Sequence, residues 1–103
     1  MNTSEPRITG PTLKVLAALL GGPRDELAGS EIARVAKLAS GTLYPILMRL
    51  EEAGWLESRW EVEDPKALGR PRRRYYRVTG IGARKARDAV RGMEPVFGRP
   101  AWA

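Results

Sequence analysis

The side chains that could do chemistry in this chain are arginines, and they gather in one part of the sequence. Residues 70–91 carry nine Lys and Arg against one Asp, whereas residues 1–69 carry 8 basic and 10 acidic residues. The overall charge of +6 is therefore a local block. Such a block is typical of a protein that binds a polyanion, most often a nucleic acid. Its densest part is a run of four arginines, Arg70, Arg72, Arg73 and Arg74.

The composition argues against catalysis and metal binding. The 103 residues include no Cys and no His, which removes the commonest general base and the commonest metal ligand. No carboxylate pair lies beside a pocket-forming motif, so we expect neither an enzyme nor a cofactor. The lack of cysteine suits a reducing cytoplasm. The sequence has no signal-like N-terminus and no apolar run of about 20 residues, so we expect neither a secretion signal nor a membrane span.

Residues 40–54 have the pattern of a short helix with a marked start and end. Ser40 is a candidate N-cap, and Gly54 lies where a left-handed residue would close the helix. Apolar residues recur at the i, i+3, i+4, i+7 spacing of one buried face, namely Leu43, Ile46, Leu47 and Leu50. The opposite face has an unusual composition for a plain solvated surface: Thr42, Tyr44, Pro45, Met48 and Arg49.

Two further helices are predicted before this segment. Leu13–Leu20 is apolar on more than one side, so we expect it to meet both the core and a second subunit. Ser30–Leu38 predicts a short helix with Ser30 as its cap and four inward residues, Ile32, Val35, Ala36 and Leu38. Its tight turn into residues 40–54 indicates a helix-turn-helix, a pattern that many helical hairpins share.

A β-hairpin and a final helix follow. Leu56–Val62 alternates apolar and polar residues, and Arg72–Val78 has the pattern of a returning strand. The four arginines fall at the hairpin tip and the start of its second strand, where a wing would approach a phosphate backbone. Thr79 is a candidate N-cap for a basic helix from Gly80 to about Met93. The predicted fold is mainly α with a small β-hairpin, a winged helix-turn-helix of order α-α-α-β-β-α.

Two separated stretches resemble the PadR family of bacterial transcriptional regulators. Gly41–Leu56 resembles the GTLYP recognition-helix motif, and Gly69–Thr79 with Gly82 resembles the family's wing return. The resemblance extends over about Leu13–Met93. It implies a cytoplasmic, nucleoid-associated homodimer that binds a short palindromic operator in double-stranded DNA and usually represses transcription. Some members release DNA when a small planar effector binds.

The resemblance also assigns regions within a single domain of residues 1–103. It implies a DNA-binding winged helix-turn-helix over 11–79, a dimerisation helix over 80–93 and a tail over 94–103 that matches no family motif. The short C-terminal part resembles the compact subgroup of the family. Because members dimerise through the first and the C-terminal helix, the interface candidates are Leu13, Leu16, Leu20, Ile81, Ala86, Val90 and Met93.

The predicted reading surface is the outer face of the helix at 40–54. Arg49 could donate to guanine O6 and N7, or pair with Glu52 on a solvated face. Tyr44 could contact a phosphate or sugar, or be a half-buried core residue. Ser40 and Thr42, beside the helix N-terminus, favour phosphate. The residues expected to face the major groove are Thr42, Tyr44, Pro45 and Arg49.

The remaining arginines and tryptophans have less definite roles. Those of the hairpin are expected to bind phosphates, with a solvated charge run as the alternative. The basic residues of the final helix could face solvent, a partner's carboxylates or outer DNA: Arg84, Lys85, Arg87 and Arg91. Trp55 is expected to pack under the wing and Trp60 to support the hairpin. Trp102 either stacks on a planar ligand at the dimer interface or is disordered.

Two other functions are also compatible with the sequence. A winged helix that binds RNA would use the same basic wing but favour shape and 2′-OH contacts. A winged helix that binds only proteins would need none of the wing arginines.

Overall fold

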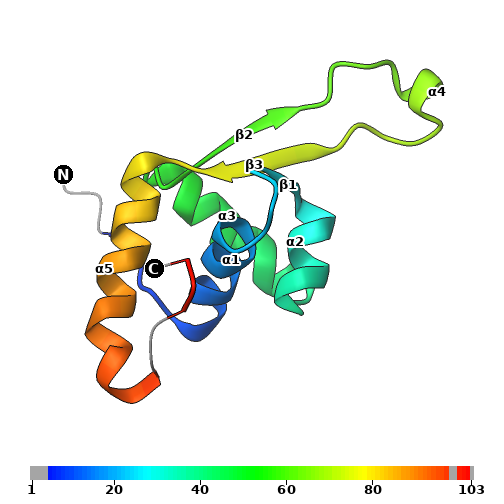
Figure 1. Cartoon of the computed structure of the whole chain (residues 1–103). Helices are drawn as coiled ribbons and strands as arrows, with labels where there is room; N and C mark the ends of the chain where they lie inside the picture. The colour runs from blue at the N-terminus through cyan, green and yellow to red at the C-terminus, as the bar shows by residue number, and fades with distance from the viewer. Residues whose placement is uncertain (1–4, 98–99, 103) are drawn as a thin grey trace.

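The computed structural model describes residues 5–97 and 100–102, except the side chains of 93–97. Three helices gather beneath one face of a small sheet, the C-terminal helix packs at their side, and the hairpin of the sheet projects away from them (Figure 1). This arrangement confirms the mainly helical winged helix-turn-helix that the sequence predicts. In chain order the elements are α1 (Gly10–Leu20), β1 (Leu27–Ala28), α2 (Gly29–Ala36), α3 (Ser40–Glu52), β2 (Leu56–Trp60), α4 (Pro65–Leu68), β3 (Arg74–Val78) and α5 (Gly80–Phe97).

Helix α1 packs against α2, α3, β3 and α5 and contributes to the core. Thr9 is its N-cap, because its Oγ1 accepts a hydrogen bond from the Thr12 backbone N–H at 3.3 Å, and Pro11 occupies the first turn. The side chains that it buries include Val15, Leu16 and Leu19. It ends at the glycine pair that follows Leu20, as predicted.

Helix α2 begins one residue before the predicted cap. The N-cap is Ala28, and Ser30 lies inside the first turn, so the assignment of Ser30 is wrong. Glu31 supplies the capping hydrogen bond, because its Oε1 accepts from the Ala28 N–H at 2.9 Å. Val35, predicted to face inward, is half exposed. The buried face of α2 is therefore narrower than the apolar pattern indicates.

Helix α3 keeps the predicted buried stripe and the predicted end. The four residues of the stripe are 4% exposed or less: Leu43, Ile46, Leu47 and Leu50. Gly54 has a φ of +79°, and the next residue, Trp55, donates its N–H to the Leu50 carbonyl at 2.9 Å, as expected of a left-handed C-terminal cap. The start differs, because the N-cap is Ala39 and Ser40 already lies in the helix without a capping bond.

The sheet contains a third strand that the sequence does not reveal. β1 pairs with β3, which also pairs with β2, so the antiparallel order is β1-β3-β2. Both hairpin strands are shorter than predicted. β2 ends at Trp60 rather than Val62, and β3 begins at Arg74 rather than Arg72.

Helix α5 is anchored beside the end of α3. Thr79 acts as the predicted cap, since its Oγ1 accepts from the Gly82 N–H at 3.1 Å. A Cβ on Gly82 would lie 2.1 Å from the carbonyl oxygen of Trp55, so this close approach requires glycine. The helix continues to Phe97, beyond the expected end at Met93. Among the described residues, no helix combines the length and the apolar character that crossing a membrane requires.

Candidate nucleic-acid interface

The face of α3 opposite the buried stripe is open to solvent. Its assigned residues are all exposed: Ser40, Thr42, Tyr44, Pro45, Met48 and Arg49. Tyr44 is 46% and Met48 is 58% exposed. Arg49 makes no ion pair with a carboxylate of the described residues, so the alternative pairing with Glu52 is not formed. Contact of this face with DNA stays a prediction.

Tyr44 joins the outer face of α3 to the start of α2. A Cβ on Gly29 would lie 2.8 Å from the Tyr44 hydroxyl oxygen and 3.1 Å from its Cε1. The ring therefore packs directly on the backbone of Gly29, the first residue of α2. This contact leaves the ring half exposed, which suits both of the roles that the sequence left open for it.

The wing consists of β2, β3 and the tip between them. Beyond the paired strands, the Glu61 N–H donates to the Arg73 carbonyl at 3.0 Å and keeps the two segments of the hairpin together. The tip carries α4, which Asp64 caps and Gly69 ends with a φ of +69°. In Figure 1 this tip extends away from the helical body.

Arg70 is held within the wing. Its Nη1 and Nη2 donate to Glu61 Oε1 and Oε2 at 2.6 and 3.0 Å, which forms a bidentate pair. Glu61 Oε1 also accepts from the Arg73 backbone N–H at 2.7 Å. These hydrogen bonds, that of Arg70 first, lower the pKa of Glu61 to about 2. The guanidinium predicted to bind phosphate is engaged inside the chain.

Arg74 is also paired within the chain. Its Nε donates to Ser58 Oγ at 2.9 Å, and its Nη2 lies 3.2 Å from Glu51 Oε1. The guanidinium carbon lies 5.5 Å from the ring centroid of Trp60 and 5.8 Å from that of Tyr76. Arg74 therefore has partners on α3, on β2 and on its own strand.

Arg72 and Arg73 keep their charge available. Arg72 donates its Nε to the Glu63 carbonyl at 2.9 Å, a neutral partner. The Arg73 guanidinium contacts no carboxylate of the part of the chain that the structure describes. Together with Arg74, Tyr44 and Trp60, both residues line a hollow of about 390 Å³ between the wing, α3 and the start of α2. Trp60 is 56% exposed and lines the same hollow.

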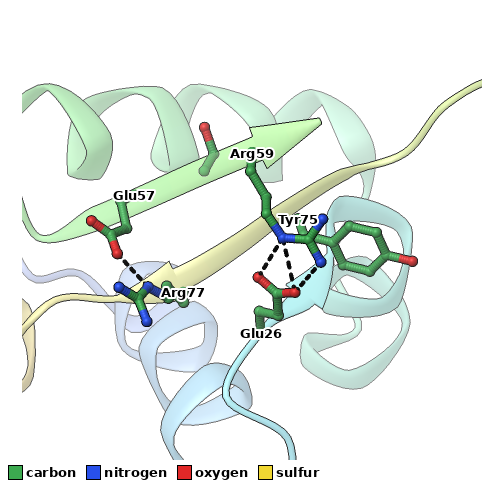
Figure 2. Close-up of a pocket in the computed structure, with 6 residues that line it drawn as sticks. Glu26, Glu57, Arg59, Tyr75 and Arg77 are labelled. Carbon is green, nitrogen blue, oxygen red and sulfur yellow. Dashed lines mark hydrogen bonds and ion pairs between the residues drawn. The ribbon is translucent and has the colours of Figure 1, made fainter. Parts of the chain in front are cut away.

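The charged side chains on the outer face of the sheet form ion pairs. Figure 2 shows Arg59 beside Glu26 and Arg77 beside Glu57. The Arg59 Nε donates to Glu26 Oε1 at 3.1 Å, and this hydrogen-bonded pairing lowers the pKa of Glu26. The Arg59 guanidinium also lies 5.0 Å from the ring centroid of Tyr75. Because these charges cancel, the outer face offers little attraction to a polyanion.

Ion pairs also neutralise part of the positive charge of residues 70–91. Five of its basic residues pair with a carboxylate: Arg70 with Glu61, Arg74 with Glu51, Arg77 with Glu57, Lys85 with Glu5 and Arg91 with Asp88. The others make no such contact within residues 5–97 and 100–102: Arg72, Arg73, Arg84 and Arg87. Of these four, only Arg72 and Arg73 lie in the wing.

Several predicted dimer contacts belong to the interior of one chain. Three residues are 3% exposed or less because α1 and α5 pack on each other and on the core: Leu16, Ala86 and Val90. Their assignment to an interface is corrected to the core of a single chain. Leu13 and Leu20 are partly buried and Ile81 is half exposed, so these three stay candidates. The side chain of Met93 lies outside the described residues.

Trp102 packs against the body of the chain. Its Cδ1 lies 3.6 Å from the position that a Cβ on Gly21 would take, directly after α1, and its ring is partly buried. A role in stacking on a planar ligand stays a prediction.

The fold and this surface define a winged helix-turn-helix protein, with α3 as its exposed helix and a basic wing beside it. The sequence model of the transcriptional regulator PadR-like family matches residues 26–88, from the segment before β1 into α5. The chain therefore belongs to the PadR-like family, whose members are DNA-binding transcriptional regulators.

Solved structures share this fold. A PadR family transcription regulator from hypervirulent Clostridium difficile R20291 is 22% identical, with a TM-score of 0.69 over 85% of this chain and 91% of that chain. A PadR family transcriptional regulator from Eggerthella lenta DSM 2243 is 29% identical, with a TM-score of 0.64 over 82% and 74%. The PcaV transcriptional regulator from Streptomyces coelicolor, solved with its natural ligand, is 26% identical, with a TM-score of 0.63 over 91% and 64%. No curated protein sequence matches the chain.

Proposed function

We propose that the chain is a homodimeric repressor that binds a palindromic operator in the bacterial chromosome. The observation that carries this proposal is the placement of charge. Tyr44 of the exposed α3 face lines one hollow together with the wing arginines Arg72, Arg73 and Arg74, of which Arg74 is paired with Glu51. The arginines on the outer face of the sheet are paired with Glu26 and Glu57. Only the first of these two surfaces combines side chains that can read bases with charge that can bind phosphates.

The two parts of this surface have different roles. Arg49 donates to guanine in the major groove, a contact worth about 1–3 kcal/mol of discrimination between bases. Thr42, Tyr44 and Pro45 form the rest of the reading face, with Ser40 at the phosphate beside the helix start. Arg72 and Arg73 bind phosphates and fix the register of the complex without reading sequence.

Selection of bound sequences from a random DNA pool tests the proposal. A two-fold symmetric dimer requires an inverted repeat whose half-sites lie about one helical turn apart. A selected site without symmetry would exclude the dimeric reading. Equal affinity for duplex RNA at the same salt concentration would favour the RNA-binding alternative.

Substitutions separate base reading from phosphate binding. Arg49→Ala should relax base preference at one position in each half-site, whereas Arg73→Gln should weaken all sequences alike. Two free arginines in each wing give four phosphate contacts for a dimer, so the wings account for a slope of about −3.6 in log K against log salt. That slope corresponds to a loss of about 10² in affinity between 50 and 200 mM salt. Arg73→Gln should lower its magnitude by about 1.8.

Arg77→Gln is the matched control for this measurement. It removes the same charge from the adjoining strand, but on the face that Glu57 neutralises. We expect its salt slope to equal that of the unchanged protein. If Arg73→Gln and Arg77→Gln lowered the salt slope equally, the assignment of phosphate binding to Arg72 and Arg73 would be wrong.

A further inference from the structure

One wing arginine is built into the junction between the wing and α3. Glu51 lies in the last turns of α3, Ser58 in the middle of β2 and Arg74 at the start of β3. Ser58 Oγ donates to Glu51 Oε2 at 2.5 Å and accepts from Arg74 Nε at 2.9 Å, while Arg74 Nη2 lies 3.2 Å from Glu51 Oε1. The three side chains therefore close a ring of polar contacts, the Glu51–Ser58–Arg74 triad.

The triad lies where the wing leaves the body. Trp60 and Arg74 are the last residue pair of the β2–β3 ladder. Beyond this pair the two segments of the hairpin continue without a third strand beside them. A two-stranded ribbon by itself is only marginally stable and twists easily. The direction of the wing relative to α3 consequently depends on contacts made at its base.

The guanidinium of Arg74 is suited to hold this junction. Its planar fork donates to a hydroxyl and a carboxylate at once, and its face lies over the Trp60 and Tyr76 rings. The side chains of Arg74 and Glu51 are 39% and 32% exposed, so solvent screens the pair only in part. A lysine at this position would keep the charge but not the fork.

We propose that Arg74 is a positioning residue: through Glu51 and Ser58 it fixes the wing relative to α3, and it does not itself bind phosphate. This inference rests on the proposed operator binding. It assigns Glu51 a favourable role in binding DNA even though its charge repels phosphate. It also divides the four wing arginines, because Arg70 and Arg74 hold the wing and Arg72 and Arg73 contact DNA.

The two possible roles of Arg74 predict opposite results for Glu51→Gln. If Arg74 binds phosphate, removal of the nearby negative charge should leave binding unchanged or tighten it. If the triad positions the wing, the same change should weaken binding roughly tenfold, because the wing is no longer preorganised. Arg74→Gln should cause a loss of similar size, and the double variant should lose little more than either single one.

The experiment measures dissociation constants on the selected operator as a function of salt, for the full-length chain. We expect Arg74→Gln and Glu51→Gln to weaken binding with the salt slope unchanged, while Arg73→Gln lowers the slope by about 1.8 for a dimer. Arg74→Lys should bind as weakly as Arg74→Gln. Ser58→Ala, which changes no charge, should weaken binding with the same unchanged slope, and it serves if either charge variant fails to fold.

The outcomes separate the two proposals. The positioning role would be overturned if Arg74→Gln lowered the salt slope as much as Arg73→Gln does, and if Glu51→Gln or Ser58→Ala bound as tightly as the unchanged protein. Operator binding would still stand after that result. Failure of the unchanged protein to select any DNA sequence would overturn both.

Discussion

Replacing Gly82 by alanine should drive α5 away from the end of α3. An added Cβ would lie 2.1 Å from the carbonyl oxygen of Trp55, 2.9 Å from its carbonyl carbon and 3.0 Å from its Cα. All three atoms belong to the backbone, so no side chain can move to relieve the clash. A carbon and an oxygen that are not bonded need about 3.3 Å, so the two segments must separate by about 1 Å.

The cost follows from the bonds that this separation breaks. The Thr79 N–H donates to the Trp55 carbonyl at 3.0 Å, and Thr79 Oγ1 donates to the Gly54 carbonyl at 2.6 Å. A shift of about 1 Å takes both beyond hydrogen-bonding distance, at about 1 kcal/mol each. Strain in the surrounding core adds about 1–3 kcal/mol, and the better helix propensity of alanine returns at most about 1 kcal/mol. We expect a net loss of about 2–4 kcal/mol, or a Tm lower by roughly 10–25 °C.

Thermal and urea unfolding followed by circular dichroism measures this loss, at one protein concentration because association would shift the apparent stability. Gly92→Ala is the matched control, since it lies in the same helix and its added Cβ would meet no atom of the described residues within 4 Å. It should stabilise the protein by about 0.5–1 kcal/mol. If Gly82→Ala were as stable as Gly92→Ala, the close packing of α5 on Trp55 would be refuted.

Two further predictions concern the wing and the reading face. The lowered pKa of Glu61 means that its contribution to stability is complete above the ordinary carboxyl pKa of 4.5 and is lost as the pH falls toward 2. Carboxyl NMR shifts should therefore show Glu61 still ionised near pH 3, and Arg70→Gln should raise its midpoint toward 4.5; an unchanged midpoint would contradict the pair. Gly29→Ala should displace the Tyr44 ring and weaken operator binding with little effect on unfolding, because the ring is half exposed. In a Tyr44→Ala background the same change should have no further effect, and additive losses would argue against this contact.

The parts of the fold that could be predicted were those with a local cause. The buried stripe of α3 follows from helical spacing, and its end follows from Gly54, whose φ of +79° suits glycine. Ser30 and Ser40 were wrong as caps, because the N-caps are Ala28 and Ala39, two residues and one residue earlier, and Glu31 supplies the capping hydrogen bond of α2. Ser is preferred to Ala as an N-cap by about 0.5–2 kcal/mol, which is not enough for residue type alone to decide where a helix begins.

Other parts depended on segments far apart in the sequence. β1 is two residues long and exists because β3 pairs with it, so no alternation of its own could reveal it. Leu16, Ala86 and Val90 matched an apolar face for a partner subunit, but the packing of α1 against α5 buried them within one chain.

The candidate site shows the same division. The sequence by itself determined that a helix carries Thr42, Tyr44, Pro45 and Arg49 on its outer face and that a basic hairpin follows, because helical periodicity and charge density are properties of neighbouring residues. Only the tertiary structure decided which arginines of the run keep a free charge. Arg70 and Arg74 differ from Arg72 and Arg73 in where the fold brings carboxylates, since Glu61 faces the first across the wing and Glu51 reaches the second from α3. A charge is neutralised by the groups near it in space, and that proximity is set by the packing of the wing on α3.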